Sequence, residues 1–428
     1  MTAVTLPLTA GRELPGPPAT HAVRQAALAE LTAVGWPTRR REQWRYTDLE
    51  PLATAQLNLT PAPTSGTARE AVSRLLDAPE FGARGRQLAL LDGQLLRPAT
   101  ALAPLEISET ESRWSEFEAR FARAIATASY PLAALNTAFL QRGLWLRLPA
   151  RTSVAGPIHI VVASSARSGV ATQPRIIIEA EEGAEATIVQ HFVDCDNASP
   201  GWVNGVTQLD LAAGSRLKLY RFQEHNRERT HTSLLAAELA AGAELTAAYF
   251  DLGGKLVRND VAVRLSGRGA RTELTGLFLA GTSQHVDNHT TIQHAAGETV
   301  SRENFRGIIG ERGRGVFNGK VVVESGCQRI DAEQHNDNLL LGEHAEINAK
   351  PELEIYANDV KCSHGSTVGE LDAEQLFYLR ARGLDTPTAR RLLTTAFAAV
   401  ILDLVHDEST RAHATERVTA HLARLMES

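Results

Sequence analysis

The sequence predicts a mainly β protein, in which a β-solenoid core lies between helical N-terminal and C-terminal regions. Helical spacing of apolar residues is confined to the two ends of the chain, while short runs of β-favouring residues recur through residues 151–370. Turn glycines recur in that central region with spacings of 31, 28, 27 and 28 residues. These observations divide the chain into an N-terminal helical region (1–150), the solenoid core (151–370) and a C-terminal helical region (371–428).

The first 150 residues are expected to form helices and loops. Residues 20–34 are rich in Ala and Leu, with Thr20 as the candidate N-cap and Gly35 ending the pattern. A second helix is predicted over residues 110–128, where three aromatic residues follow helical spacing: Trp114, Phe117 and Phe121.

The central region repeats itself weakly. The segments EAEEGAEATIV, DLAAGSRLKLY, ELAAGAELTAA and RLSGRGARTEL each place a small turn between two alternating strands, and HAAGETV adds a fifth turn. Such a repeat is typical of a solenoid, in which each coil buries its apolar face on the next. An antiparallel sandwich is the alternative, but at some 220 residues it would be unusually large. The turn glycines are Gly183, Gly214, Gly242, Gly269 and Gly297.

Helical spacing returns after residue 370. One helix is predicted over residues 371–384, and Thr386 is the expected N-cap of the next, with Pro387 at its first position. The segment 388–405 is so apolar that it requires burial beneath the solenoid or against a partner protein. An amphipathic segment over residues 410–426 closes the chain.

Composition excludes several classes of protein. With a net charge of −6, the chain lacks the clusters of basic residues that bind nucleic acid, and its first residues lack the features of a signal peptide. The longest apolar stretch, Ala396–Val405, is interrupted by Asp403 and is too short to span a membrane. Three cysteines make a disulfide framework improbable. We therefore expect a cytoplasmic protein that binds neither nucleic acid nor membrane.

Cys362 and His364 form the first candidate site, in the segment DVKCSHGSTVGELD. On a strand, residues two apart face the same side, about 6–7 Å apart. A thiolate and an imidazole presented together suit a soft or borderline metal, although two ligands do not complete a tetrahedral site. A partner residue, a second chain or a sulfide would have to supply the rest. The alternative is a buried structural cysteine beside a hydrogen-bonded histidine.

The segment HVDNHTTIQH offers a second cluster. It places His285, Asp287 and His289 on one strand face, with His294 on the other. Metal binding is one interpretation, but a polar ladder between stacked coils is favoured. The remaining cysteines, Cys195 and Cys327, have no neighbours at ligand spacing.

Common catalytic signatures are absent from the sequence, which has no P-loop, no G-x-S-x-G and no C-x-x-C. Glu352 and Glu354 would face one side of a strand, as acidic residues do in β-helix enzymes that act on carbohydrates. Such enzymes line a groove with aromatic residues for sugar stacking, whereas aromatics make up only 5% of this chain. We therefore expect no enzymatic turnover, and keep a carbohydrate-active enzyme as an alternative.

Taken together, the motifs resemble the SufB/SufD family of the SUF iron–sulfur cluster assembly system. They include PTRRREQWRYTDL, PLAALNTAFLQRGLWLRLP, QHVDNHTTIQH and RGVFNGKVVVE. The most specific is the run of more than fifty residues from DAEQHNDN through DVKCSHGSTVGELD to LFYLRARGL. Chain length and the pairing of VKCSHG with LFYLRARG resemble the SufD branch more than the SufB branch.

The resemblance implies a right-handed parallel β-helix that pairs with a SufB-type paralogue through one end. It also implies that a SufC-type ATPase binds the C-terminal helices, and that its ATP-driven dimerisation rearranges the interface between the two paralogues. The family's metal-handling residues correspond to Cys362 and His364, which would contribute to a nascent iron–sulfur cluster or to the site where iron enters. Reduced flavin is a further implied cofactor of the complex, without support from a dinucleotide fingerprint. A clamp without metal contact, and a homodimer of the isolated chain, are the alternatives.

Overall fold

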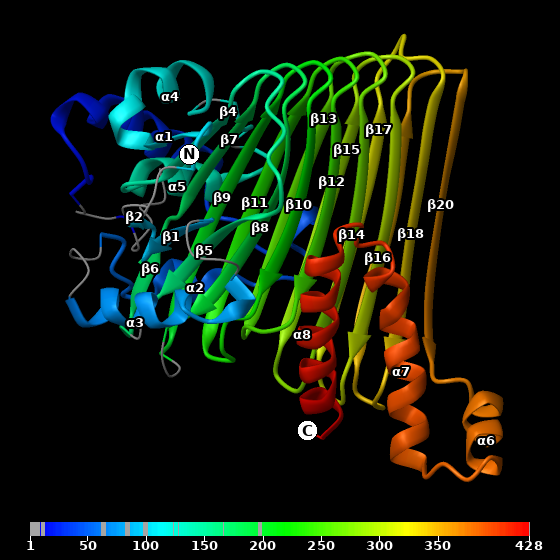
Figure 1. Cartoon of the computed structure of the whole chain (residues 1–428). Coiled ribbons are helices and arrows are strands. Elements are labelled where there is room, and N and C mark those ends of the chain that lie inside the picture. Colours follow the sequence, from blue (N-terminus) through cyan, green and yellow to red (C-terminus); the bar gives the residue numbers. More distant parts are fainter. Residues whose placement is uncertain are drawn as a thin grey trace.

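The computed structural model is mainly β and confirms a solenoid with helices at both ends (Figure 1). Two ten-stranded sheets face each other, and successive strands of the core alternate between them. All pairings from β5 to β20 are parallel, so the antiparallel sandwich is excluded. The structure describes residues 9, 13–60, 66–81, 86–96, 102–122, 124–126, 128–165, 167–195 and 199–427.

We call the two sheets A and B. In spatial order, sheet B consists of β2 (Gln94–Leu96), β1 (Gln87–Leu91), β5 (Ile158–Ser164), β8 (Glu185–Asp194), β10 (Arg216–Gln223), β12 (Glu244–Asp251), β14 (Arg271–Ala280), β16 (Val300–Ile309), β18 (Ile330–Leu340) and β20 (Val360–Glu370). Sheet A consists of β19 (Glu346–Ile355), β17 (Arg314–Val323), β15 (His285–His294), β13 (Leu256–Leu265), β11 (Arg229–Leu239), β9 (Gly201–Leu211), β7 (Arg175–Ala180), β4 (Leu144–Leu148) and β3 (Glu106–Glu109), with β6 (Val170–Thr172) beside β9.

The helices lie outside this core. They are α1 (His21–Val34), α2 (Glu50–Thr54), α3 (Gly66–Leu76), α4 (Trp114–Arg120), α5 (Pro131–Phe139), α6 (Ala373–Ala381), α7 (Thr386–Leu402) and α8 (Glu408–Glu427). Short 3₁₀ turns add η1 (Pro18–Thr20), η2 (Glu42–Trp44), η3 (Pro79–Phe81) and η4 (Thr110–Arg113). In the described residues, no helix is long and apolar enough to cross a membrane.

Turn chemistry explains why the glycine spacing revealed the fold. Gly183, Gly214, Gly242 and Gly269 all have φ between 65° and 74°, a region that favours glycine. At the fifth turn it is Glu298, the residue after the predicted glycine, that has a positive φ of 60°. Four of the five glycines therefore have the backbone role that the repeat predicted.

The N-terminal region contains strands that the sequence did not predict. β1 to β4 lie within the first 150 residues and extend both sheets. β4 has the sequence LWLRL: its leucines face the core, and Trp145 is buried on the outer side. Such short strands, covered on both faces, lack the polar–apolar alternation that identifies a half-buried strand.

The predicted N-terminal helices are partly confirmed. α1 occupies the predicted range and ends at Gly35, whose N–H donates to the Leu31 carbonyl at 2.7 Å. Thr20 does not cap it with its side chain; the hydroxyl instead donates to the Pro17 carbonyl at 2.8 Å. The helix expected over residues 110–128 is only η4 followed by α4, which stops at Arg120.

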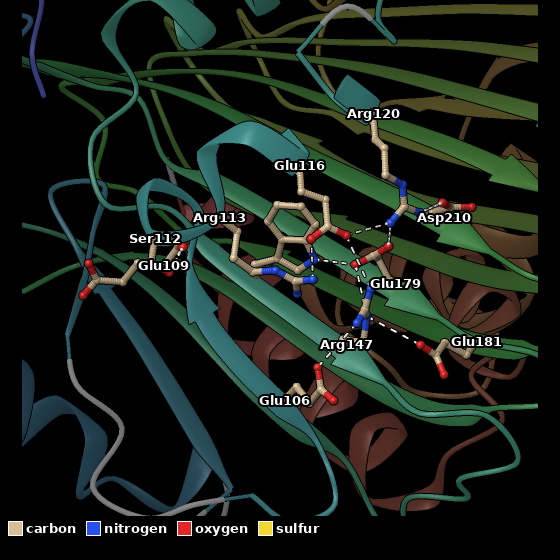
Figure 2. A network of polar contacts seen from close by, with 11 residues as sticks. Glu106, Glu109, Ser112, Arg113, Glu116, Arg120, Arg147, Glu179, Glu181 and Asp210 are labelled. Carbon is tan, nitrogen blue, oxygen red and sulfur yellow. Dashed lines mark hydrogen bonds and ion pairs between the residues drawn. The ribbon is translucent and has the colours of Figure 1, made fainter. Parts of the chain in front are cut away.

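An ion-pair network fixes α4 on the outer face of sheet A (Figure 2). Glu179 is buried, accepts a hydrogen bond from Trp145 Nε1 at 2.6 Å, and pairs with Arg120. Arg120 Nη2 also lies 2.6 Å from Asp210 Oδ2, and Arg147 Nε lies 3.5 Å from Glu179 Oε2. The network ties the helix to three strands of the first coils.

The C-terminal helices cover the outer face of sheet B. α7 and α8 pack against apolar residues of that face in one buried cluster, so the predicted burial of the apolar segment occurs within the chain. The N-cap of α7 is Asp385, which accepts from the Thr388 N–H at 2.8 Å; the predicted cap, Thr386, is the first helical residue. A carboxylate satisfies an N-terminal N–H as a hydroxyl does, and it also faces the positive end of the helix dipole.

Candidate functional site

The last coil of the solenoid ends without a cover. β19 and β20 each have a strand neighbour on one side only, within the part of the chain that the structure describes. Their inward-facing residues continue buried rows of β17 and β18, yet they are exposed or half-buried themselves. These residues, here called the open-end surface, are Ile347, Ala349, Pro351, Leu353, Ile355, Val360, Cys362, His364, Ser366 and Val368.

The open-end surface has the properties of an interface. Val368 is 51% exposed, Ile355 is 38% exposed and the adjoining Tyr356 is 63% exposed. Grouped apolar side chains at this exposure are characteristic of protein interaction sites. The outer edges of the two strands also present unpaired backbone N–H and C=O groups, to which another strand can pair.

The structure places Cys362 and His364 together on this surface. Both lie on β20, in register with Ala332 and Gln334 of β18, which are buried in the core. They therefore face the same side of the strand, at about 6–7 Å along it.

The two residues have different surroundings. Cys362 is half-buried against an apolar cluster, and burial and the nearby Asp331 raise the pKa of its thiol. His364 is exposed, and no hydrogen bond reaches it from the residues that the structure describes.

Buried polar residues continue inward from His364. Gln334 lies one strand deeper and donates through Nε2 to Glu303 Oε2 at 2.6 Å. Burial raises the pKa of Glu303 to about 7. Sequence reasoning missed both residues, although their positions in alternating strands give them the inward parity of His364.

Further polar pairs lie deeper between the sheets. Arg221 Nη1 lies 3.2 Å from Asp251 Oδ1, and Asn259 Nδ2 donates to Asp251 Oδ2 and Asn288 Oδ1, both at 2.8 Å. The interior of the middle coils is thus filled partly by paired polar groups.

The second candidate cluster is already engaged in holding the N-terminal segment. Asp287 Oδ2 lies 2.7 Å from Arg258 Nη1 and also accepts from the Thr47 hydroxyl, while Asp287 Oδ1 lies 3.0 Å from His289 Nε2. His285 Nε2 lies 2.9 Å from the same hydroxyl. Burial alone would raise the pKa of Asp287, but Arg258 and His289 hold it well below its usual range.

These contacts match the polar-ladder interpretation better than metal binding. The ladder joins neighbouring strands and the N-terminal segment, and His294 faces the interior between Thr299 and Ser301, at 2.7 and 3.0 Å. In the described residues, no group of three or more His, Cys, Asp and Glu side chains is arranged to hold a metal ion.

The two acidic residues of the carbohydrate-enzyme alternative are each paired with a lysine. Glu352 lies 2.7 Å from Lys350 Nζ, and Glu354 lies 2.6 Å from Lys320 Nζ. Carboxylates of a glycosidase act as a pair across a sugar-binding cleft. The lysine contacts here provide a structural role for both carboxylates instead.

A family model described as SUF system FeS cluster assembly, SufBD core domain, matches residues 161–397, more than half of the chain. The chain belongs to the SufB/SufD family. The resemblance inferred from the sequence motifs is therefore confirmed. The matched segment contains most of the solenoid and reaches into α7.

Similar proteins from two bacteria and a plant align along most of the chain. It is 31% identical over 405 residues to the iron-sulfur cluster assembly protein SufD of Escherichia coli (strain K12), covering 93% of this chain and 92% of that protein. An iron-sulfur cluster assembly SufBD family protein of Synechocystis sp. is 29% identical over 397 residues, covering 89% and 86%. Protein ABCI7, chloroplastic, of Arabidopsis thaliana is 29% identical over 414 residues, covering 92% and 85%.

Proposed function

We propose that this chain is a SufD-type scaffold subunit for iron–sulfur cluster assembly. Its open-end surface pairs with a SufB-type paralogue, and His364 and Cys362 contribute ligands to a nascent cluster or to the site where iron enters. The observation that carries this proposal is the uncovered last coil, which presents an imidazole and a thiol among exposed apolar residues. Thiolate and imidazole ligands suit iron–sulfur chemistry, and an incomplete ligand set suits a scaffold that must release its product.

The C-terminal helices are the proposed binding site for a SufC-type ATPase. α6 buries none of its residues, and Phe377 and Tyr378 on it are 73% and 56% exposed. On α7, Leu392 is 50% exposed although the opposite side of the helix is buried on sheet B. Figure 1 shows α6 extending away from the solenoid beyond α7.

Side-chain contacts provide a route from these helices to the cluster site. Arg306 on β16 donates to the Phe397 carbonyl of α7 at 2.9 Å and lies 3.2 Å from Asp337 on β18. The Thr367 hydroxyl on β20 donates to Asp337 at 2.6 Å. A displacement of α7 by the ATPase would therefore act on the strand that carries Cys362 and His364.

Cluster content of a co-expressed complex tests the ligand role. The chain is produced with its SufB-type and SufC-type partners as wild type, His364→Ala and Cys362→Ala, and iron and sulfide are measured in the purified complex. We expect His364→Ala to lower cluster content by about tenfold or more without loss of the complex. His344→Ala, an exposed histidine in the turn after β18, is the matched control and should leave cluster content unchanged.

The purely structural clamp predicts the opposite result. If both variants retain the complex and its cluster, the two side chains are not ligands and the subunit only holds its partners together. The ATPase contact is tested separately by Phe377→Ala and Tyr378→Ala, which should weaken binding of the ATPase, whereas Glu416→Ala on the exposed side of α8 should not.

A further inference from the structure

Three inward-facing residues form a column that ends at the open-end surface. Glu303, Gln334 and His364 occupy matching positions on β16, β18 and β20. Neighbouring strands of a sheet lie about 4.8 Å apart, so each side chain is within reach of the next. Gln334 is fully buried between a carboxylate on one side and an exposed imidazole on the other.

The surroundings of Gln334 fix which way its amide points. Its nitrogen donates to Glu303 Oε2 at 2.6 Å, and once Glu303 is ionised its carboxylate can only accept, so it must face the NH₂ end of the amide. Gly319 on sheet A lies against the same nitrogen, because a Cβ at that position would be 1.9 Å from Gln334 Nε2. The amide is therefore held by two neighbours, and its oxygen is the atom left to face elsewhere.

That oxygen has no partner. Gln334 Oε1 is buried and accepts no hydrogen bond from the residues that the structure describes. A buried acceptor without a donor is unfavourable, and native proteins rarely retain one. His364 is the next residue in the column, it is exposed, and its ring can turn toward Gln334 and supply an N–H.

We propose that Gln334 is a positioning residue for His364, accepting a hydrogen bond from one ring nitrogen through Oε1. The other ring nitrogen then keeps its lone pair and faces the open end of the solenoid. A histidine that binds metal usually donates its second N–H to a neighbouring acceptor, which fixes both the tautomer and the direction of the ring. The inference rests on the proposed function, because it supposes that the outward nitrogen meets iron.

Nitrogen NMR of the metal-free full-length chain tests the hydrogen bond directly. The chain is labelled with ¹⁵N-histidine, and the His364 signals are assigned by their loss in His364→Ala. We expect one protonated and one unprotonated ring nitrogen in the wild type, fixed in a single tautomer. Gln334→Met, which keeps the length of the side chain but removes the acceptor, should shift both signals toward the average of two exchanging tautomers.

Glu303→Gln provides a second variant if Gln334→Met fails to fold, as judged by circular dichroism and thermal unfolding. It keeps the shape of residue 303 but no longer dictates the orientation of the Gln334 amide. The two His364 ring-nitrogen signals should therefore shift part of the way toward the average of two exchanging tautomers. Averaged tautomers in the wild type, or unchanged signals in a folded variant, would overturn the inference.

This result is distinguishable from failure of the proposed function. The NMR measurement contains no metal, so it reports on positioning even if His364→Ala leaves cluster content unchanged in the complex. In the complex, Gln334→Met should lower cluster content by about tenfold, the usual effect of removing such a hydrogen-bond partner from a metal ligand.

Discussion

The two ends of the solenoid are built from the same ladder of strands but finish differently. At the N-terminal end, the inward residues Leu88, Leu90 and Leu146 are fully buried, and Leu102 and Leu105 pack against them. The antiparallel strands β2 and β3, only three and four residues long, occupy the edges there. At the other end β19 and β20 leave edges of 10 and 11 residues and an exposed inward face.

The two ends differ in whether the chain covers its own core. Short edge strands are one way in which proteins prevent unwanted strand pairing, and a long flat edge invites it. Among the described residues, the first coil is closed by the chain's own side chains, whereas the last coil has no cover. The candidate ligands lie at the end that is left uncovered.

The largest expected effect comes from matched truncations at the two ends. Leu146→Ala removes a fully buried side chain from the closed end and should lower the free energy of unfolding by about 2–5 kcal/mol. Val368→Ala, at the open end, should change it by less than about 0.5 kcal/mol, because the side chain is half exposed. Urea unfolding of the isolated chain measures both values. Equal losses would mean that the open end is as well packed as the closed end.

The interior near the open end contains the ionisable residue Glu303, whereas leucines line the closed end. Glu303→Gln should therefore change how the stability of the chain depends on pH. The pKa of Glu303 lies above its ordinary value of 4.5, at about 7, because of burial, so the folded state holds this proton more tightly. The contribution of Glu303 to the free energy of unfolding is therefore fully present below about pH 4.5. It is lost as the pH rises to about 7, by on the order of 2–3 kcal/mol.

Unfolding measured at pH 5 and pH 8 tests this sign. The wild type should lose stability between the two values through this group, and Glu303→Gln should lose less. Glu343→Gln, at an exposed turn position, is the control and should follow the wild type. An unchanged pH dependence in Glu303→Gln would contradict the prediction.

A charge across the open-end surface should prevent pairing without unfolding the chain. Val368→Asp places a carboxylate where an apolar partner surface is expected, and we expect at least a tenfold loss of affinity for the SufB-type paralogue, or about 1.4 kcal/mol. Analytical ultracentrifugation of the mixed subunits measures it. Unaltered association of a folded variant would place the interface elsewhere.

The smallest expected effect concerns the anchoring of the open end to α7. Arg306→Met keeps the apolar stem but removes the hydrogen bond to Phe397 and the ion pair to Asp337. Amide hydrogen exchange in α7 and β20 should become about fivefold faster, corresponding to about 1 kcal/mol. Arg411→Met, exposed on α8, is the control; acceleration confined to α7 would show that the contact does not reach β20.

The regular part of the fold was predictable because the repeat has local signals. Glycines with positive φ recur at four successive turns, and α1 and α8 carry helical spacing that can be recognised without knowledge of the fold. The buried strands β1 and β4 gave no such signal. The cap at Asp385 was missed because Thr386 and Asp385 are both capable of capping and only the backbone decides between them.

The candidate site was only partly visible in the sequence. Cys362 and His364 were found by their spacing, since neighbours on one strand are also neighbours in the chain. Gln334 and Glu303 are distant from them in sequence and meet them only through strand register. Likewise, nothing local indicated that Thr47 would join the Asp287 cluster, because that contact spans 240 residues.

If chains pair through the open end as proposed, the unequal ends of the solenoid also limit how many chains can join. A ladder with two uncovered ends would add subunits indefinitely, in the manner of a growing fibre. The proposed pairing uses the open-end surface alone, so two chains joined through it about a two-fold or pseudo-two-fold axis would leave no such surface for a third chain. Under that proposal, the leucines that fill the first coil would prevent further growth from the other end and keep the assembly finite.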